Sequence, residues 1–193
     1  MFTGIVETLA KVESIEKEGT NIHFTFSSSI TNELKIDQSV AHNGCCLTVV
    51  KIKDDNYVVT AIEETLNKTN LGQLEVGHLV NLERCMPANG RFDGHVVQGH
   101  VDQLGKCIEI ADQNGSWEFT FEFEPKENVL VNKGSITING TSLTVVDPTD
   151  TTFKVCIIPY TYENTVFKQI KIGDSINLEF DIIGKYVAKL MGK

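Results

Sequence analysis

Apolar and polar residues alternate with a period of two along most of this chain, and the alternating runs are bounded by Gly, Asn and Asp. A period of two places successive side chains on opposite faces of an extended backbone, so the pattern predicts β-strands. The runs cover residues 22–26, 45–52, 56–62 and 78–83 in the first half and 117–123, 134–138, 141–147, 152–159 and 175–180 in the second.

The C-terminal segment follows a helical period instead. Ile183, Tyr186, Val187, Leu190 and Met191 are spaced i, i+3, i+4, i+7 and i+8, which predicts an amphipathic helix. A helix of about twelve residues is too short to be stable alone, so its apolar stripe must pack against something. We favour packing between subunits, because the rest of the chain is expected to form two closed barrels, as argued below, and these leave few faces of the same chain for the helix to cover.

The chain contains an internal duplication. SVAHNGCCLTVV (39–50) and SITINGTSLTVV (135–146) are identical at seven of twelve positions, with an offset of 96 residues. The same offset relates 76–83 to 172–179, and near the start the offset is 95, where Gly4 aligns with Gly99. The duplication predicts two similar folded units with two similar pockets. Such pockets would serve two like molecules, or one ligand between the halves.

Short, regularly spaced strands with little helical pattern between them favour an all-β fold. We expect two tandem six-stranded antiparallel Greek-key barrels, because closure removes exposed strand edges, followed by the C-terminal amphipathic helix. Turn residues cluster in MPANGRFDGH (86–95) and mark the boundary between the halves. The expected domains are residues 1–93, 94–182 and 183–193.

Composition excludes several classes of partner. A net charge of −9 argues against nucleic acid and anionic membranes, which need clustered Lys and Arg. No run approaches the roughly 18 apolar residues of a membrane span, and the first residues do not resemble a signal peptide. The five cysteines have no metal-binding spacing, so we expect no metal and reduced thiols in a cytoplasmic protein.

The two repeats differ where side chains could take part in chemistry. Cys46 of the first repeat corresponds to Ser142 of the second. The period of two puts Cys46 and Thr48 on one face of their strand, and Ser142 and Thr144 on one face of theirs. These polar pairs either line a pocket or satisfy nearby backbone groups, and the spacing leaves both possibilities open.

Histidines form the second difference. His100 aligns with Ile5, so one half has gained an ionisable group where the other is aliphatic. Histidine exchanges protons near neutral pH, and a gain inside a duplicated pocket favours function over a structural role. His95 and His100 lie five residues apart and on opposite strand faces, which makes them poor partners for one metal ion.

Four motifs in order resemble the riboflavin synthases of the alpha-subunit type: MFTGIVE (1–7), NGCCLTVV (43–50), DGHVVQGHVD (93–102) and NGTSLTVV (139–146). The resemblance covers the whole chain, including the duplication and the tail helix. It implies a homotrimer that converts two molecules of 6,7-dimethyl-8-ribityllumazine into riboflavin and 5-amino-6-ribitylamino-uracil by transfer of a four-carbon unit, without cofactor or metal. Each active site would lie between the first barrel of one subunit and the second barrel of its neighbour.

The resemblance also implies the site residues. One pocket would contain Cys46, Leu47, Thr48, Thr60, Ala61, Ile62, Glu63, Glu64, Thr65, Gly99, His100 and Val101, with Lys133 from an adjoining chain. The other would contain Gly4, Ile5, Val6, Ser142, Leu143, Thr144, Ile158, Pro159, Tyr160, Thr161, Tyr162 and Glu163. The expected catalytic residues are His100 and Ser142 in proton transfer and Cys46 as a polar or nucleophilic contact.

A non-catalytic lumazine- or flavin-binding protein of the same fold is the main alternative. Antenna proteins of that kind resemble the enzymes but differ at the second cysteine of NGCC and at the histidines, whereas Cys46, His95 and His100 are present here. A reductase-type barrel is disfavoured, because no GxGxxG follows a strand. The sequence leaves open which barrel binds the donor, which base acts first, and whether lumazine synthase is a partner.

Overall fold

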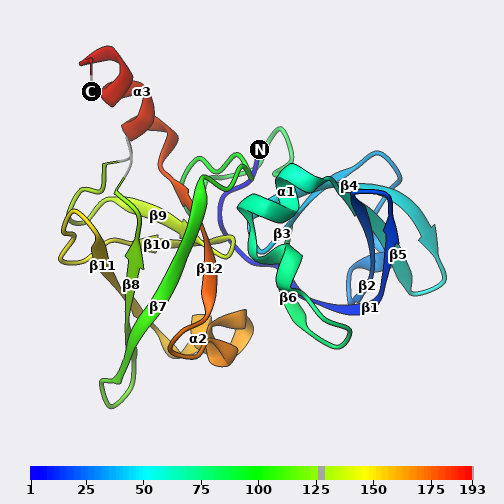
Figure 1. Cartoon of the computed structure of the whole chain (residues 1–193), viewed down its shortest axis with the longest axis horizontal. Coiled ribbons are helices and arrows are strands. Elements are labelled where there is room, and N and C mark those ends of the chain that lie inside the picture. Colours follow the sequence, from blue (N-terminus) through cyan, green and yellow to red (C-terminus); the bar gives the residue numbers. More distant parts are fainter. Residues whose placement is uncertain (126–128, 193) are drawn as a thin grey trace.

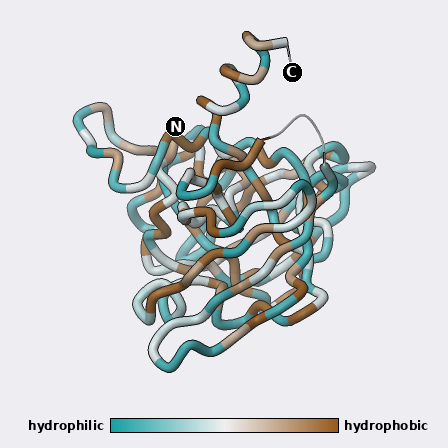
Figure 2. The backbone as a smooth tube through the Cα atoms, turned by 90° about the vertical axis from the view of Figure 1, so that its left-hand side faces the viewer, coloured by the Kyte–Doolittle hydropathy of each residue, from teal (hydrophilic) through white to brown (hydrophobic). Residues whose placement is uncertain are grey.

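The structure is a computed structural model that describes residues 1–125 and 129–192. Its strands form two antiparallel units that lie side by side, and the N-terminal segment runs between them (Figure 1). The C-terminal helix projects away from the second unit (Figures 1 and 2). The predicted all-β duplication and terminal helix are therefore confirmed.

The first unit is a closed barrel in the order β1-β2-β5-β4-β3-β6. Its core contains Phe24, Phe26, Tyr57 and Leu82, all almost fully buried. The elements are β1 (Thr8–Glu18), β2 (Asn21–Ser28), the 3-10 helix η1 (Thr31–Glu33), β3 (Ser39–His42), β4 (Cys45–Lys53), β5 (Asn56–Ala61), α1 (Glu63–Lys68), the 3-10 helix η2 (Asn70–Gln73) and β6 (Leu79–Arg84).

The second unit repeats the first, with its sheet in the order β10-β9-β12-β7-β8-β11. Phe119, Phe121, Phe153 and Phe167 dominate its separate core. The elements are β7 (Gln103–Asp112), β8 (Trp117–Phe123), β9 (Ser135–Ile138), β10 (Thr141–Thr144), β11 (Thr152–Ile157), α2 (Pro159–Asn164), the 3-10 helix η3 (Val166–Gln169), β12 (Ser175–Phe180) and α3 (Ile182–Leu190).

The second unit differs from the prediction because its sheet does not close with a full ladder. Within the described residues no ladder joins β10 to β11, and an isolated bridge pairs Val146, two residues after β10, with Lys154 of β11, whereas β4 and β5 pair as far as Lys53. The cause lies in the sequence after the shared LTVV. Asp147 takes a positive φ of 45° and Pro148 has no amide hydrogen, so the strand ends early.

Strands β1, β3 and β7 were not among the predicted runs. β1 and β7 each contain a register shift, at Val12/Ser14 and Cys107/Glu109, where an extra residue enters one strand. Such a bulge breaks the alternation of apolar and polar residues that the prediction relied on. β3 has only four residues, all of them buried or half-buried, so it shows no alternation to detect.

Two Asn-Gly turns join the halves. Asn43-Gly44 connects β3 to β4 and Asn139-Gly140 connects β9 to β10, and all four residues have positive φ. The glycines touch: a Cβ on Gly44 would lie 2.7 Å from the Gly140 nitrogen, and a Cβ on Gly140 would lie 2.7 Å from the Gly44 nitrogen. Each turn can therefore approach the other only because both residues at the contact lack a side chain.

Two buried asparagines complete the contact with reciprocal hydrogen bonds. Asn81 Nδ2 donates to the Asn139 carbonyl at 2.7 Å, and Asn177 Nδ2 donates to the Asn43 carbonyl at 2.8 Å. Asn177 Oδ1 also accepts from the Asn70 amide at 2.7 Å, as Asn81 Oδ1 does from the Val166 amide. These pairs follow the repeat offset, so the halves are related by an approximate two-fold axis through the turns.

We predict that Asn177→Ala destabilises the protein by about 2–4 kcal/mol, because the Asn70 amide and the Asn43 carbonyl each lose a buried partner. Urea unfolding followed by circular dichroism measures the change. Asn32→Ala is the matched control, since Asn32 is exposed in η1 and its replacement is expected to change stability by less than about 0.5 kcal/mol. Equal effects of both variants would contradict the role given to the asparagine contact.

Candidate functional site

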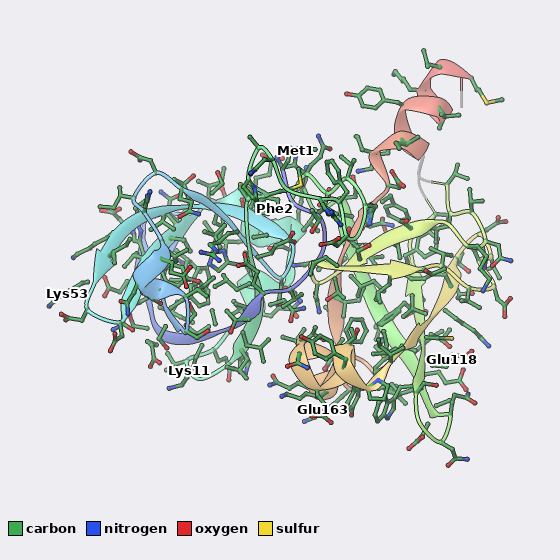
Figure 3. The ribbon with its side chains drawn as sticks, turned by 180° about the vertical axis from the view of Figure 1, so that it is seen from behind. Met1, Phe2, Lys11, Lys53, Glu118 and Glu163 are labelled. Atoms are coloured by element: carbon green, nitrogen blue, oxygen red, sulfur yellow. The ribbon has the colours of Figure 1, made fainter. Side chains whose placement is uncertain are left out.

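The N-terminal segment of each half crosses the approximate two-fold axis. Phe2 and Val97 form an antiparallel bridge, with N–H···O distances of 2.8 and 3.1 Å. Phe2 is completely buried and packs with Ala41 and Val97 between the halves, where Figure 3 labels it. The segments that begin the two repeats therefore lie beside each other, and each continues toward the opposite half.

Each crossing segment bonds to the strand that carries the polar pair of the other half. The Ser142 amide donates to the Gly4 carbonyl at 2.7 Å, and the Cys46 amide donates to the Gly99 carbonyl at 2.9 Å. Both glycines have positive φ, 76° and 81°. A Cβ on Gly4 would lie 2.6 Å from Ser142 Cβ, and one on Gly99 would lie 2.7 Å from Cys46 Cβ. The predicted partners within each pocket are thus brought together.

Buried carboxylates hold the crossing segments. Glu83 in β6 accepts from the Thr3 and Gly4 amides at 2.7 and 3.1 Å. Glu179 in β12 accepts from the amides of residues 98, 99 and 100 at 2.6–3.0 Å. Burial raises the pKa of both carboxyl groups, that of Glu179 to about 7, although the amides oppose the rise.

Each polar pair shares one face of its strand, as the period of two predicted, and the structure shows that this face points away from the barrel core. Cys46 is half-buried and Thr48 exposed, while Leu47 between them points into the barrel core. In the second half Ser142 is half-buried and Thr144 exposed. Burial raises the pKa of the Cys46 thiol, although a hydrogen bond with Ser39 lowers it, so at neutral pH this side chain is the protonated thiol.

His95 is a site residue that the sequence reasoning did not identify. Its Nδ1 lies 2.7 Å from Ser142 Oγ, and its Nε2 lies 3.3 Å from Thr137 Oγ1. Burial lowers the pKa of His95, so the imidazole is neutral at pH 7 and can accept a proton from a hydroxyl. From the sequence, His95 was considered as a metal ligand and as a feature that separates the enzymes from the antenna proteins, but no local signal places it beside a strand 47 residues further on.

His100 lies at the other pocket. Its backbone amide bonds to Glu179, and its exposed side chain makes no hydrogen bond within the described residues. The residue follows Gly99, which contacts Cys46. The structure therefore groups His100 with Cys46 and groups His95 with Ser142. The catalytic roles of His100, Cys46 and Ser142 stay predictions.

Two further predicted segments lie at the ends of β5 and β11. Thr60 to Thr65 run from β5 into α1, and Ile158 to Glu163 run from β11 into α2. Tyr162 stacks on Trp117 with ring centroids 3.8 Å apart, where the first half has Leu66 and Ile22 packed against its core. Residues 60–65 and 158–163 thus follow equivalent backbone paths, and different side chains pack at the two places.

Two cavities of the described chain lie away from the predicted catalytic residues. A cavity of about 740 Å³ lies between η2 and η3, and one of about 380 Å³ lies beside α3. Neither is lined by Cys46, Ser142 or His100. Lys133, expected from an adjoining chain, stands at an exposed turn before β9 with φ 67°.

The side chains of residues 1–125 and 129–192 form neither a cluster of potential metal ligands nor a disulfide. No cluster of three or more His, Cys, Asp or Glu residues in them has the geometry to hold a metal ion. All five cysteines are free thiols, of which Cys45 and Cys107 are buried. Within the same residues, no helix has both the length and the apolar character needed to cross a bilayer.

Comparisons with known proteins agree with the duplication. The lumazine binding domain family matches residues 3–85 and again residues 98–181. The riboflavin synthase of Actinobacillus pleuropneumoniae is 42% identical over all of this chain and 91% of its own length, and that of Bacillus subtilis is 39% identical over the same shares.

Solved structures have the same fold. LumP complexed with 6,7-dimethyl-8-(1'-D-ribityl) lumazine superposes with a TM-score of 0.83 at 22% identity, covering 93% of this chain and 99% of LumP. LumP complexed with riboflavin gives a TM-score of 0.85 at 24% identity over the same shares. At this identity the likeness establishes the fold alone.

We predict that Gly99→Ala destabilises the protein more than Gly19→Ala does. Both glycines have positive φ, and an alanine there costs about 1–2 kcal/mol. A Cβ at Gly19 meets nothing within 4 Å, whereas one at Gly99 meets Cys46 and the Phe2 ring. Thermal unfolding of the two variants measures the difference, and equal melting temperatures would show that the contact between Gly99 and Cys46 is loose.

Proposed function

The chain belongs to the riboflavin synthase family, in which two lumazine binding domains form one polypeptide, and we propose that it converts two 6,7-dimethyl-8-ribityllumazine molecules into one riboflavin and one 5-amino-6-ribitylamino-uracil. The observation that carries the proposal is the pair of equivalent sites around Cys46 and Ser142. Two copies of one substrate need two similar binding surfaces, and the duplication supplies them.

The reaction needs positioning and proton transfer. One lumazine gives up a four-carbon unit to the other, and the atoms of two substrates equal those of the two products, so no oxidant enters the balance. The C7 methyl group of lumazine is acidic because its ring delocalises the carbanion. Holding two such rings face to face contributes up to roughly 7–11 kcal/mol to catalysis.

We assign proton transfer to the outward-facing polar groups. Ser142 hydrogen-bonds to the neutral imidazole of His95 at 2.7 Å, an arrangement that favours movement of a proton between hydroxyl and base. His100 and Cys46 serve the other ring, with Cys46 acting as a thiol contact or, after loss of its proton, as a nucleophile. Thr48 and Thr144 bind the ring or the ribityl chain.

The outward position of these groups favours a homotrimer. The Cys46 and Ser142 sites face outward, and a neighbouring subunit that covers them would exclude water from the reacting rings. Helix α3 supplies an interface: Tyr186 and Leu190 are 66% and 86% exposed, and Val129 and Val131 line a cavity beside it. A second copy of the chain matches this surface, since like apolar stripes pack together.

The non-catalytic alternative rests on the LumP structures, whose fold this chain shares. It predicts tight binding of lumazine without turnover. The presence of Cys46, His95 and His100 favours the enzyme. A cytoplasmic location, suggested by five free thiols, and an association with lumazine synthase are further parts of the proposal.

We predict that the purified protein, mixed with 6,7-dimethyl-8-ribityllumazine and no added cofactor, forms riboflavin at one molecule for two consumed, as followed by absorbance. Ser142→Ala and His100→Gln lower kcat by about 10²–10⁴-fold, because each removes a group for proton transfer. Ser27→Ala and His78→Gln are the matched controls, because both residues lie in the first half and neither is a predicted site residue. Stable lumazine fluorescence with no riboflavin would make this a binding protein.

We also predict that Leu190→Asp breaks the oligomer into monomers, because a charge on the exposed stripe of α3 must be desolvated in the interface. Light scattering is expected to fall from about three times to one times the 21.4 kDa of the chain. Lys189→Asp, a charge change at the neighbouring position, controls for charge alone. A wild-type protein that is already monomeric would refute the trimer while leaving the fold intact.

A further inference from the structure

We propose that Glu83 and Glu179 are positioning residues for the reaction, each fixing through a crossing segment the pocket wall that the opposite half of the chain presents. The inference rests on the proposed function, because it assigns the two carboxylates a part in that reaction. Neither residue is itself a predicted substrate-binding residue, so each acts through the predicted site residues that it hydrogen-bonds, Gly4 for Glu83 and Gly99 and His100 for Glu179.

The two carboxylates occupy equivalent positions and are buried. Glu83 ends the VNLE of β6 and Glu179 the INLE of β12, and their exposed fractions are 6% and 3%. Within the described residues neither forms an ion pair: Lys185, the cation near Glu179, binds Asp102 at 2.6 Å. Burying a carboxylate without a cation is costly, so other bonds must stabilise these groups.

Backbone amides supply those bonds. Glu179 receives the amides of Gln98 at 2.6 Å and of Gly99 and His100 at 3.0 Å. Glu83 receives the Thr3 amide at 2.7 Å, the Thr3 hydroxyl at 3.0 Å and the Gly4 amide at 3.1 Å. Each carboxylate therefore fixes three donors of one short segment, which leaves that segment little freedom to shift.

The same segments then reach the opposite half. The Gly99 carbonyl accepts from the Cys46 amide of the first half, and the Gly4 carbonyl accepts from the Ser142 amide of the second. Between the carboxylate and the strand that bears the reactive side chain there is a single residue, a glycine in contact with that strand. Glu179 of the second half thus sets the position of Cys46, and Glu83 of the first half sets that of Ser142.

A carboxylate is suited to this role because both its oxygens only accept hydrogen bonds. Glutamine keeps the size but turns one acceptor into an amide donor, which opposes the backbone N–H groups. The bonds to a carboxylate are also stronger than those to a neutral group. Glu179→Gln and Glu83→Gln therefore release the segments with the least change in volume.

The first measurement is the amide spectrum of isotope-labelled protein at about pH 8. Glu179→Gln is expected to shift the amide resonances of Gly99, His100 and Cys46 while leaving those of Gly4 and Ser142 in place. Glu83→Gln is expected to give the opposite pattern. Shifts at both sites in both variants would indicate general loosening and overturn the proposal, as would a Cys46 amide that ignores Glu179→Gln.

The second measurement is turnover. Each variant is expected to lower kcat about 10- to 100-fold and to change KM much less, because small displacements of reacting groups chiefly affect the chemical step. Glu122→Gln, on the exposed face of β8, is the matched control. Unchanged kcat in a variant with the predicted amide shifts would overturn the positioning role. Absence of turnover in the wild type would refute the proposed function, and the amide pattern would still test the geometry.

If one variant does not fold, the other half provides an independent test of the same proposal. Glu83→Gln leaves the second core untouched, and Glu179→Gln leaves the first core untouched, since the cores are separate. Either variant alone shows whether the amide shifts appear at its own crossing segment and at the strand of the opposite half while the other site stays unchanged.

Discussion

The contact between the two Asn-Gly turns is the constraint on which the rest of the structure depends. Gly44 and Gly140 meet with no room for a side chain, and buried asparagines lock the turns with reciprocal bonds. Cys46 and Ser142 follow these turns by two residues, so the element that fixes the two-fold axis also fixes where the strands that bear these predicted catalytic side chains begin. The spacing of the two sites is therefore a consequence of a backbone contact that only glycine permits.

The duplication preserves the backbone contacts of the two sites and changes their side chains. The backbone hydrogen bonds of the crossing segments are the same in both halves. At equivalent positions of the repeat, however, Cys46 is replaced by Ser142 and Ile5 by His100. Trp117 and Tyr162 stack where the first half has aliphatic residues, and only the first sheet closes fully. A dismutation requires this combination, because two identical molecules must be bound alike and yet undergo different reactions.

Local patterns in the sequence predicted what depends on local periodicity, and missed what depends on contacts across the chain. The alternating runs located most strands, and the repeat predicted two equivalent units. The bulges in β1 and β7 hid two strands, and Pro148 prevented the predicted closure of the second sheet. His95 was missed because its partner Ser142 becomes a neighbour only when the N-terminal segments cross. The asparagine network likewise joins residues from both halves, so no single window contains it.

The crossing segments explain why the two halves remain one functional unit although each has its own core. A barrel whose reactive strand relied only on its own neighbours would be complete by itself. Here the Cys46 amide bonds to a glycine of the second half, and the Ser142 amide to a glycine of the first. Each glycine is held by a carboxylate from its own half, so the support of each reactive strand comes from the other unit. The halves are thus joined twice, once at the turns and once at the sites, and neither half alone holds the strand that bears Cys46 or Ser142.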